Sequence, residues 1–291
     1  MITYPNVKIN LGLHVLRKRE DGFHDLETLF VPYEGIHDTL EIIKGDDYSR
    51  TSTALFGNYG SSKMMEDDVS MLAQAISDDG RLMMTIARKE GVDWNPMDDL
   101  CAKAYRILAD EYDLPPVKMF LEKTSPVGAG LGGGSADAAF ALRMLNELFS
   151  LGLSDDALAG YAARLGSDCA FFIYNRPMIG RGRGEILSPF DLDDSFFRDY
   201  EIQVLSPEGI SVSTAEAYRG ISPRIPEISL LEALSRPVEE WDGILVNDFE
   251  STVFAGHPEL AAIKRSLYDS GAVYASMSGS GSSLFAIYKK D

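Results

Sequence analysis

Cysteines and long apolar runs are scarce in this sequence. Of its 291 residues only Cys101 and Cys169 are cysteines, which is too few for a disulfide framework and lacks the spacing of metal ligands. No run of eighteen apolar residues occurs, and the amino terminus has no charged segment followed by an apolar stretch. We therefore expect a protein of the reducing cytoplasm that is neither exported nor membrane-spanning.

Basic residues are also few. Lys and Arg number 27 against 45 Asp and Glu, so the formal net charge is -18. Nucleic acids and anionic membranes recruit clusters of Lys and Arg, and neither is expected as a partner. A phosphate ligand would have to be held by backbone amides, a metal ion and a few well-placed cations.

The chain is longer than one hydrophobic core usually serves, and its 45% hydrophobic content can supply a sizeable core. Two packed lobes are therefore expected, with a boundary near residue 175 that separates 1–174 from 175–291. Residues 45–95 have no sustained period and are interpreted as an insertion or flexible excursion. Elsewhere the apolar spacing predicts strands within 2–16, 26–43, 117–123, 200–205, 272–277 and 283–289, and helices at about 98–112, 135–149, 155–165 and 258–267.

The most distinctive feature is a glycine stretch at residues 126–135 (PVGAGLGGGS), with five glycines in seven positions. Glycines remove the Cβ atoms that would keep a polyanion from the backbone, and successive N–H groups can then face one concavity. Because Ser135 opens an amphipathic helix, the stretch also leads to the positive end of a helix dipole. The pattern predicts a phosphate-binding loop between a strand and a helix.

Two other phosphate-binding loops have similar patterns. A P-loop needs a Lys followed by Ser or Thr, which this stretch lacks. Gly128, Gly130 and Gly133 do satisfy the G-x-G-x-x-G spacing of a dinucleotide-binding fold. Against that fold, the strand at 117–123 alternates with Lys and Glu and is expected to have one solvated face, and Glu147 comes too early for the ribose-binding acid. The dinucleotide fold remains the alternative.

Several segments together resemble one family. PVGAGLGGGSADAA is similar to the central motif of the galactose, homoserine, mevalonate and phosphomevalonate (GHMP) kinase superfamily, and SMSGSGSSLF at 276–285 to its third motif. VKINLGL at 7–13, with DGFH at 21–24, resembles the first motif of the diphosphocytidyl-methylerythritol kinases. LGSDCAFF at 165–172 is similar to their segment with the catalytic aspartate, whereas residues 45–95 do not match.

This resemblance implies an α+β, two-lobed fold. The lobe at 1–174 would be ATP-binding and like the second domain of ribosomal protein S5, and the lobe at 175–291 would be substrate-binding and ferredoxin-like. The implied reaction transfers the γ-phosphoryl group of ATP, with Mg²⁺, to the 2-hydroxyl of 4-diphosphocytidyl-2-C-methyl-D-erythritol. The oligomeric state stays open.

The resemblance also implies a role for each matched residue. Asp168 would take or orient the proton of the acceptor hydroxyl, and Lys8 would stabilise the developing charge. His24 would read the edge of the cytosine and Tyr218 would stack on its ring. The residues implied to contact ATP are Pro126, Gly128, Gly130, Gly132, Gly133, Gly134 and Ser135, and the others implied to contact substrate are Asn10, Phe23 and Thr214.

One position departs from the family pattern. Asp99 stands where relatives usually have the Asn that opens the adenine-binding helix, and a carboxylate cannot donate a hydrogen bond as an amide can. No carboxylate is marked out for Mg²⁺, so a protein ligand would be Ser135 or none. Two alternatives remain: a kinase for another small alcohol such as homoserine or mevalonate, which the DGFH segment disfavours, and a non-catalytic ligand-binding relative, which the presence of Lys8 and Asp168 disfavours.

Overall fold

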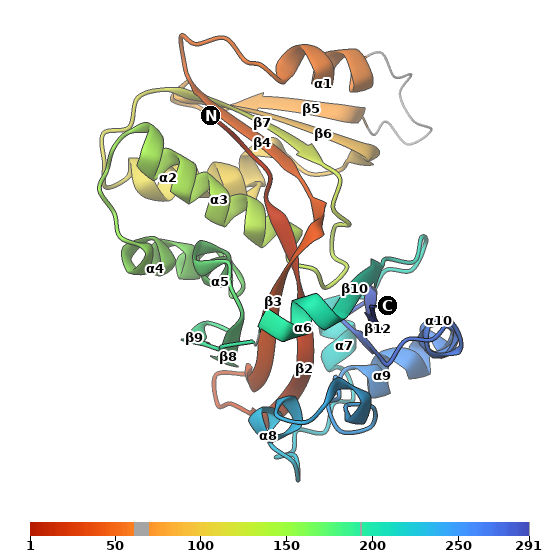
Figure 1. Cartoon of the computed structure of the whole chain (residues 1–291). Coiled ribbons are helices and arrows are strands. Elements are labelled where there is room, and N and C mark those ends of the chain that lie inside the picture. The colour runs from red at the N-terminus through yellow and green to blue at the C-terminus, as the bar shows by residue number, and fades with distance from the viewer. Residues whose placement is uncertain (61–69, 193, 291) are drawn as a thin grey trace. The chain divides into compact units, whose positions relative to one another are not determined.

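The computed structural model describes residues 1–60, 70–192 and 194–290, and Figure 1 shows the path of the chain. Its contacts divide it into two compact units. Unit 1 consists of Met1–Val7, Tyr33–Val127 and Gly132–Asn175, and unit 2 of Lys8–Pro32, Gly128–Leu131 and Arg176–Asp291. The expected boundary near residue 175 coincides with one of these limits, but residues 8–32 and 128–131 join unit 2.

Unit 1 is built on a five-stranded sheet with the strand order β1-β4-β7-β6-β5. Strands β6 and β7 are parallel and the other neighbours are antiparallel. Its elements are β1 (Ile2–Thr3), β4 (Thr39–Lys44), α1 (Ser52–Tyr59), β5 (Ser70–Ile76), β6 (Leu82–Val92), a 3-10 turn (Pro96–Asp98), α2 (Leu100–Ala109), β7 (Val117–Lys123), α3 (Gly133–Leu148), α4 (Asp155–Leu165) and α5 (Cys169–Tyr174).

Helices cover both faces of this sheet. Helices α2 and α3 pack side by side below it in Figure 1, and α1 lies above it. Phe120 of β7 is buried against Leu55 of α1, together with Ile43 and Ala87. The expectation that the strand at 117–123 has a solvated face is therefore wrong for its centre, because the covering helix comes from residues that have no clear pattern of their own.

Residues 45–95 are also more regular than expected. They contain α1, β5 and β6, while 61–69 lie outside the described residues. Strand β6 is set by its neighbour, since Met84 lies opposite Met119 and Ile86 opposite Leu121 in the parallel ladder with β7. The interpretation of residues 45–95 as an excursion is therefore wrong. Strand β6 is specified by its pairing with the central strand β7 rather than by local periodicity.

Unit 2 holds a three-stranded sheet of order β10-β12-β11 and most of a four-stranded sheet of order β2-β3-β8-β9. The long strands β2 (Asn6–Lys18) and β3 (His24–His37) contribute residues to both units. The other elements of unit 2 are β8 (Met178–Gly182), β9 (Ile186–Pro189), α6 (Asp194–Asp199), β10 (Tyr200–Leu205), α7 (Thr214–Tyr218), α8 (Leu230–Leu234), a 3-10 turn (Val238–Glu240), α9 (Glu250–Gly256), α10 (Pro258–Asp269), β11 (Tyr274–Met277) and β12 (Leu284–Lys289).

The core of unit 2 joins β2 to the carboxy-terminal elements. Leu13 and Val15 of β2 pack with Phe249, Val253 of α9 and Met277 of β11. This packing brings the first motif segment and the third together, although they are separated by most of the chain. Among the described residues no helix is both long and apolar enough to cross a bilayer.

A buried ionic cluster, which we call the Lys123 cluster, ties together the elements around the glycine stretch in unit 1. The Lys123 ammonium lies 2.5 Å from Asp38 Oδ2 and 2.6 Å from Asp137 Oδ2, and Ser125 Oγ donates to Asp38 Oδ2 at 2.6 Å. Lys123 ends β7, Ser125 begins the approach to the glycine stretch, and Asp137 lies near the start of α3. The cluster therefore fixes both ends of the glycine stretch within this unit.

The two carboxyl groups of the Lys123 cluster differ. Burial alone would raise the pKa of Asp38, but the Lys123 ammonium and the hydrogen bonds from Ser125 outweigh it and lower the pKa. Burial raises the pKa of Asp137 well above its ordinary value despite the same ammonium, and Asp137 Oδ1 has no hydrogen-bond partner. Asp38 is therefore the ionised partner of Lys123, and Asp137 is the one that favours a proton.

We predict that Asp38→Asn lowers the free energy of unfolding by about 3 to 5 kcal/mol, because it removes the ionised partner of a buried ammonium. Asp137→Asn should lower the free energy of unfolding much less. Since the folded state raises the pKa of Asp137, wild-type stability should fall as the pH rises through that pKa, and Asp137→Asn should lessen this fall. Urea titrations over a pH series measure both effects, and equal losses for the two variants would contradict the assignment.

Candidate active site

The glycine stretch adopts the backbone that its composition predicts. Gly128, Gly130 and Gly132 have φ values of +71°, +80° and +73°, in the left-handed region that side-chain-bearing residues avoid. Gly132 is the N-cap of α3, so Ser135 lies in its first turn. The first N–H groups of a helix have no acceptor within it, and those of α3 can bind an anion.

Gly133 is a glycine for a different reason from the one expected. A Cβ atom there would lie 2.3 Å from Ser125 Oγ and 3.3 Å from Lys123 Nζ. The missing side chain therefore makes room for the Lys123 cluster, and binding of a phosphate by Gly133 stays a prediction. At Gly134 the nearest atom to a Cβ would be Leu100 Cδ1 at 3.9 Å, so that glycine has space beside it.

Asp168 lies at the start of α5, next to the first turn of α3. Its carboxylate does not accept a capping hydrogen bond from its own helix, so the simple capping role does not account for it. The following residue, Cys169, has its thiol hydrogen-bonded to Ser135, and burial raises its pKa to about 12. The thiol therefore stays protonated, and within unit 1 Asp168 and Ser135 lie close together.

Lys8 of unit 2 is buried, with 2% of its surface exposed. Its Nζ donates to Asn10 Oδ1 at 2.5 Å and to Gly130 O at 2.8 Å. Asn10 in turn donates to Thr28 Oγ1 at 3.0 Å, which fixes the orientation of its amide. The structure thus joins Lys8 and Asn10, two residues expected at the site, to the backbone of the glycine stretch.

Two of the residues expected to bind the base are in direct contact. The rings of His24 and Tyr218 stack with their centroids 4.7 Å apart and an interplanar angle of 22°, and Phe249 meets Tyr218 edge-on. His24 therefore covers one face of Tyr218, and the stacking of Tyr218 on a cytosine stays a prediction. Phe23 is 52% exposed, with the Arg183 guanidinium 4.9 Å from its ring centroid.

Burial lowers the pKa of His24, and the nearby Lys18 lowers it further. The imidazole is therefore neutral at pH 7, with one nitrogen that donates and one that accepts a hydrogen bond. This is the pairing that the edge of a cytosine requires. Thr214, at the start of α7, is exposed, and its contact with substrate stays a prediction.

Asp99, which stands where relatives usually have an Asn, has a local structural role. Its Oδ1 accepts a hydrogen bond from Cys101 N at 2.9 Å and caps α2, and its Oδ2 accepts one from Trp94 Nε1 at 3.3 Å. An Asp serves as well as an Asn for such a cap. The departure from the family pattern is thus compatible with the start of α2 in unit 1.

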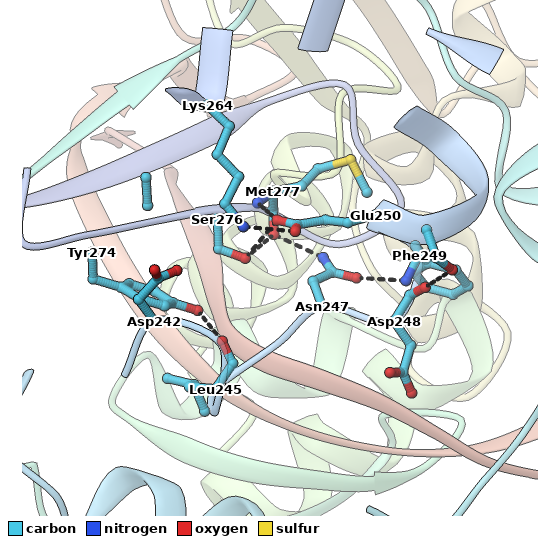
Figure 2. Close-up of polar contacts among 12 residues, drawn as sticks. Asp242, Leu245, Asn247, Asp248, Phe249, Glu250, Lys264, Tyr274, Ser276 and Met277 are labelled. Carbon is cyan, nitrogen blue, oxygen red and sulfur yellow. Dashed lines mark hydrogen bonds and ion pairs between the residues drawn. The ribbon is translucent and has the colours of Figure 1, made fainter. Parts of the chain in front are cut away.

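Sequence reasoning missed the residues that hold the second glycine loop (residues 278–283). Asn247 and Glu250 contact the backbone at its start, as Figure 2 shows. Ser278 donates to Gly130 O at 3.1 Å, the carbonyl that also accepts from Lys8. The only signal in the sequence was an unexplained Asn-Asp-Phe-Glu segment at 247–250 ahead of the third motif.

Comparisons with known proteins identify the family of this chain. The model of the GHMP kinases N terminal domain matches residues 99–176, and that of the GHMP kinases C terminal matches 230–291. The 4-diphosphocytidyl-2-C-methyl-D-erythritol kinase of Bacteroides thetaiotaomicron is 45% identical over 291 residues, which cover all of this chain and 93% of the relative. The chain belongs to the 4-diphosphocytidyl-2-C-methyl-D-erythritol kinase family.

Two further members of the 4-diphosphocytidyl-2-C-methyl-D-erythritol kinase family support the assignment. The kinase of Bacteroides fragilis is 42% identical over 292 residues, covering all of this chain and 93% of its own. A crystal structure of 4-(cytidine 5'-diphospho)-2C-methyl-D-erythritol kinase has a TM-score of 0.69 and 28% identity, and covers 98% of this chain and 89% of that one. The resemblance and the α+β GHMP kinase fold are confirmed, and the dinucleotide-binding fold is excluded.

We predict that Gly130→Ala damages the site far more than Gly128→Ala. Both positions have positive φ, which costs an alanine about 1 to 2 kcal/mol. At Gly130 the new Cβ would also lie 2.1 Å from Ser278 O, whereas at Gly128 it would meet nothing within 4 Å. Calorimetric titration with ATP should show lost affinity for Gly130→Ala and affinity within a few-fold of wild type for Gly128→Ala. Equal losses would mean that backbone strain alone matters.

Proposed function

We propose that this protein transfers the γ-phosphoryl group of ATP to the 2-hydroxyl of 4-diphosphocytidyl-2-C-methyl-D-erythritol, the compound after which its relatives are named as kinases. The observation that carries the proposal is the full-length similarity to those kinases, together with the anchoring of Lys8 on the Gly130 carbonyl. A buried ammonium held on the glycine stretch is suited to a phosphoryl group that gains negative charge in the transition state.

Each part of the site has a proposed role in this reaction. The N–H groups at the start of α3 would hold ATP phosphate oxygens. Asp168 would accept or orient the proton of the acceptor hydroxyl, the role that the resemblance of LGSDCAFF to the segment with the catalytic aspartate implies. Lys8 would stabilise the developing charge, and Asn10 would hold the Lys8 ammonium in place and contact the acceptor alcohol.

Mg²⁺ is proposed to accompany ATP. No group of three His, Cys, Asp or Glu side chains in the described parts of the chain could hold a metal ion. The Ser135 hydroxyl in the first turn of α3 is a hard oxygen ligand of the kind that Mg²⁺ accepts. The bound ion would neutralise phosphate charge, with most of its other ligands being phosphate oxygens and water.

Recognition of the cytidine end is assigned to unit 2. The neutral His24 imidazole would donate one hydrogen bond to the base and accept another, and Tyr218 would hold the plane of His24 by stacking. The exposed ring of Phe23 would supply a stacking surface. Thr214 would contact the substrate, as the family resemblance implies.

We predict that Asp168→Asn lowers kcat by about 10²- to 10⁴-fold, the usual contribution of a positioned acid or base, and leaves the affinity for ATP unchanged. A coupled assay of ADP release measures kcat, with 4-diphosphocytidyl-2-C-methyl-D-erythritol, homoserine and mevalonate as candidate acceptors. The wild-type protein should turn over only the cytidylated alcohol. Turnover by Asp168→Asn within a few-fold of wild type would remove Asp168 from the mechanism.

We predict that His24→Ala raises KM for the cytidylated substrate by about 5- to 150-fold, which corresponds to the 1 to 3 kcal/mol of a lost buried hydrogen-bond partner. KM for ATP should stay constant. Because the pKa of His24 is lowered, wild-type affinity should weaken only when the pH falls below the ordinary histidine range and the imidazole becomes charged.

The control for His24→Ala is His37→Ala, which removes an exposed histidine of unit 1. It should leave both KM values and the pH profile as in wild type. A His24→Ala defect confined to KM for ATP, or an unchanged acid limb in the pH profile of kcat/KM, would contradict the assignment of His24 to the base.

A further inference from the structure

We propose that Asn247 and Glu250 are positioning residues that act on Lys8 through the second glycine loop. The inference deepens the proposed function, on which it rests for its kinetic readout. Neither residue belongs to the expected catalytic or binding set. Both lie in unit 2, at the start of α9, and face the backbone where β11 ends (Figure 2).

Both the nitrogen and the oxygen of the Asn247 side-chain amide make hydrogen bonds. It is 2% exposed, and its Nδ2 donates to Met277 O at 2.7 Å and to Gly279 O at 2.9 Å. Its Oδ1 accepts from Phe249 N at 3.0 Å, so the amide cannot rotate without losing bonds. Two carbonyls two residues apart are thus held to one amide, which sets the turn by which the chain leaves β11.

Glu250 also binds Met277, but through the backbone N–H instead of the carbonyl. Its Oε1 accepts from Met277 N at 2.8 Å and from Ser276 Oγ at 3.0 Å, and its Oε2 lies 2.7 Å from Lys264 Nζ. Both the N–H and the C=O of Met277 are therefore bound to side chains from one short segment. Charge-assisted bonds of this kind are about twice as strong as neutral ones.

The second glycine loop connects the contacts of Asn247 and Glu250 with Lys8. Ser278 Oγ and Lys8 Nζ donate to the same acceptor, Gly130 O, at 3.1 Å and 2.8 Å. A Cβ atom at Gly279 would lie 2.8 Å from Gly130 O and 3.3 Å from Lys8 Nζ, so the loop is in close contact with the ammonium. A shift of the loop must therefore move the carbonyl that orients Lys8, or the ammonium itself.

The segment around Asn247 is also tied to the strand that carries Lys8. Leu13 N donates to Val246 O and Asp248 N donates to Leu13 O, both at 2.9 Å. Asn247 thus connects β2 directly with the second glycine loop. The buried amide thus lies where an isolated parallel β-bridge pairs Asn247 with Leu13.

The test is Asn247→Asp, which keeps the size of the side chain and replaces the donating Nδ2 with an acceptor facing two carbonyls. We expect kcat at saturating concentrations of both substrates to fall by about 10²-fold, the effect of displacing a catalytic group by about 1 Å. Both KM values should change by less than about threefold. A residue with a purely structural role would lower Tm and leave kcat per folded molecule intact.

The matched control is Asn146→Asp, the same chemical change in a loop-holding asparagine of unit 1. Asn146 Nδ2 donates to Leu153 O at 3.1 Å and its Oδ1 accepts from Leu153 N at 3.0 Å. The Asn146→Asp protein should lose thermal stability and keep its kcat. In a second pair, Glu250→Ala should lower kcat strongly and Glu250→Gln should restore part of it, because a glutamine oxygen can still accept from Met277 N.

Amine-selective acylation of Lys8, followed by peptide mass spectrometry, separates this inference from the proposed function. In the wild-type protein Lys8 is buried and bonded and should react slowly. Asn247→Asp should accelerate its labelling and Asn146→Asp should not, whether or not the chosen alcohol is a substrate. An unchanged kcat together with unchanged labelling in folded Asn247→Asp and Glu250→Ala proteins would overturn the inference. Failure of the kinase assay in wild type alone would count against the proposed function only.

Discussion

The close approach of Gly130 to the second glycine loop is the constraint on which the candidate site depends. A Cβ at residue 130 would lie 2.1 Å from Ser278 O, so only glycine allows the two backbones to meet. Their contact is completed by Ser283 N, which donates to Ala129 O at 3.1 Å. The Gly130 carbonyl then faces Lys8, so the backbone of the glycine stretch and the Asn10 side chain together set the position of the buried cation.

In unit 1, buried charged side chains hold the ends of the glycine stretch in place. The Lys123 cluster joins the end of β7, the approach to the glycine stretch and the start of α3, and Gly133 leaves the space that Ser125 and Lys123 occupy. A buried ion pair contributes less stability than its short distances suggest, because both charges must be removed from water. Its value here lies in geometry: it holds the amino-terminal end of α3 in one place.

Elements with strong local signals were predicted well. Helices α4 and α10 and strands β7 and β10 lie where their apolar spacing predicted them, and Ser154 caps α4 with its Oγ accepting from Ala157 N. Errors arose where the partner lies far away in sequence. Strand β6 takes its register from β7, and the buried centre of β7 needs α1.

The sequence by itself determined the family and about half of the regular elements, and it predicted the phosphate-binding character of residues 126–135, because each depends on backbone preferences within a few neighbouring residues. Only the tertiary structure decided that Lys8 binds the Gly130 carbonyl, 122 residues away, that Gly133 serves the Lys123 cluster, and that Asn247 and Glu250 hold the second glycine loop. Such contacts follow from how distant segments pack and leave no periodic signal, so no local pattern could have assigned them.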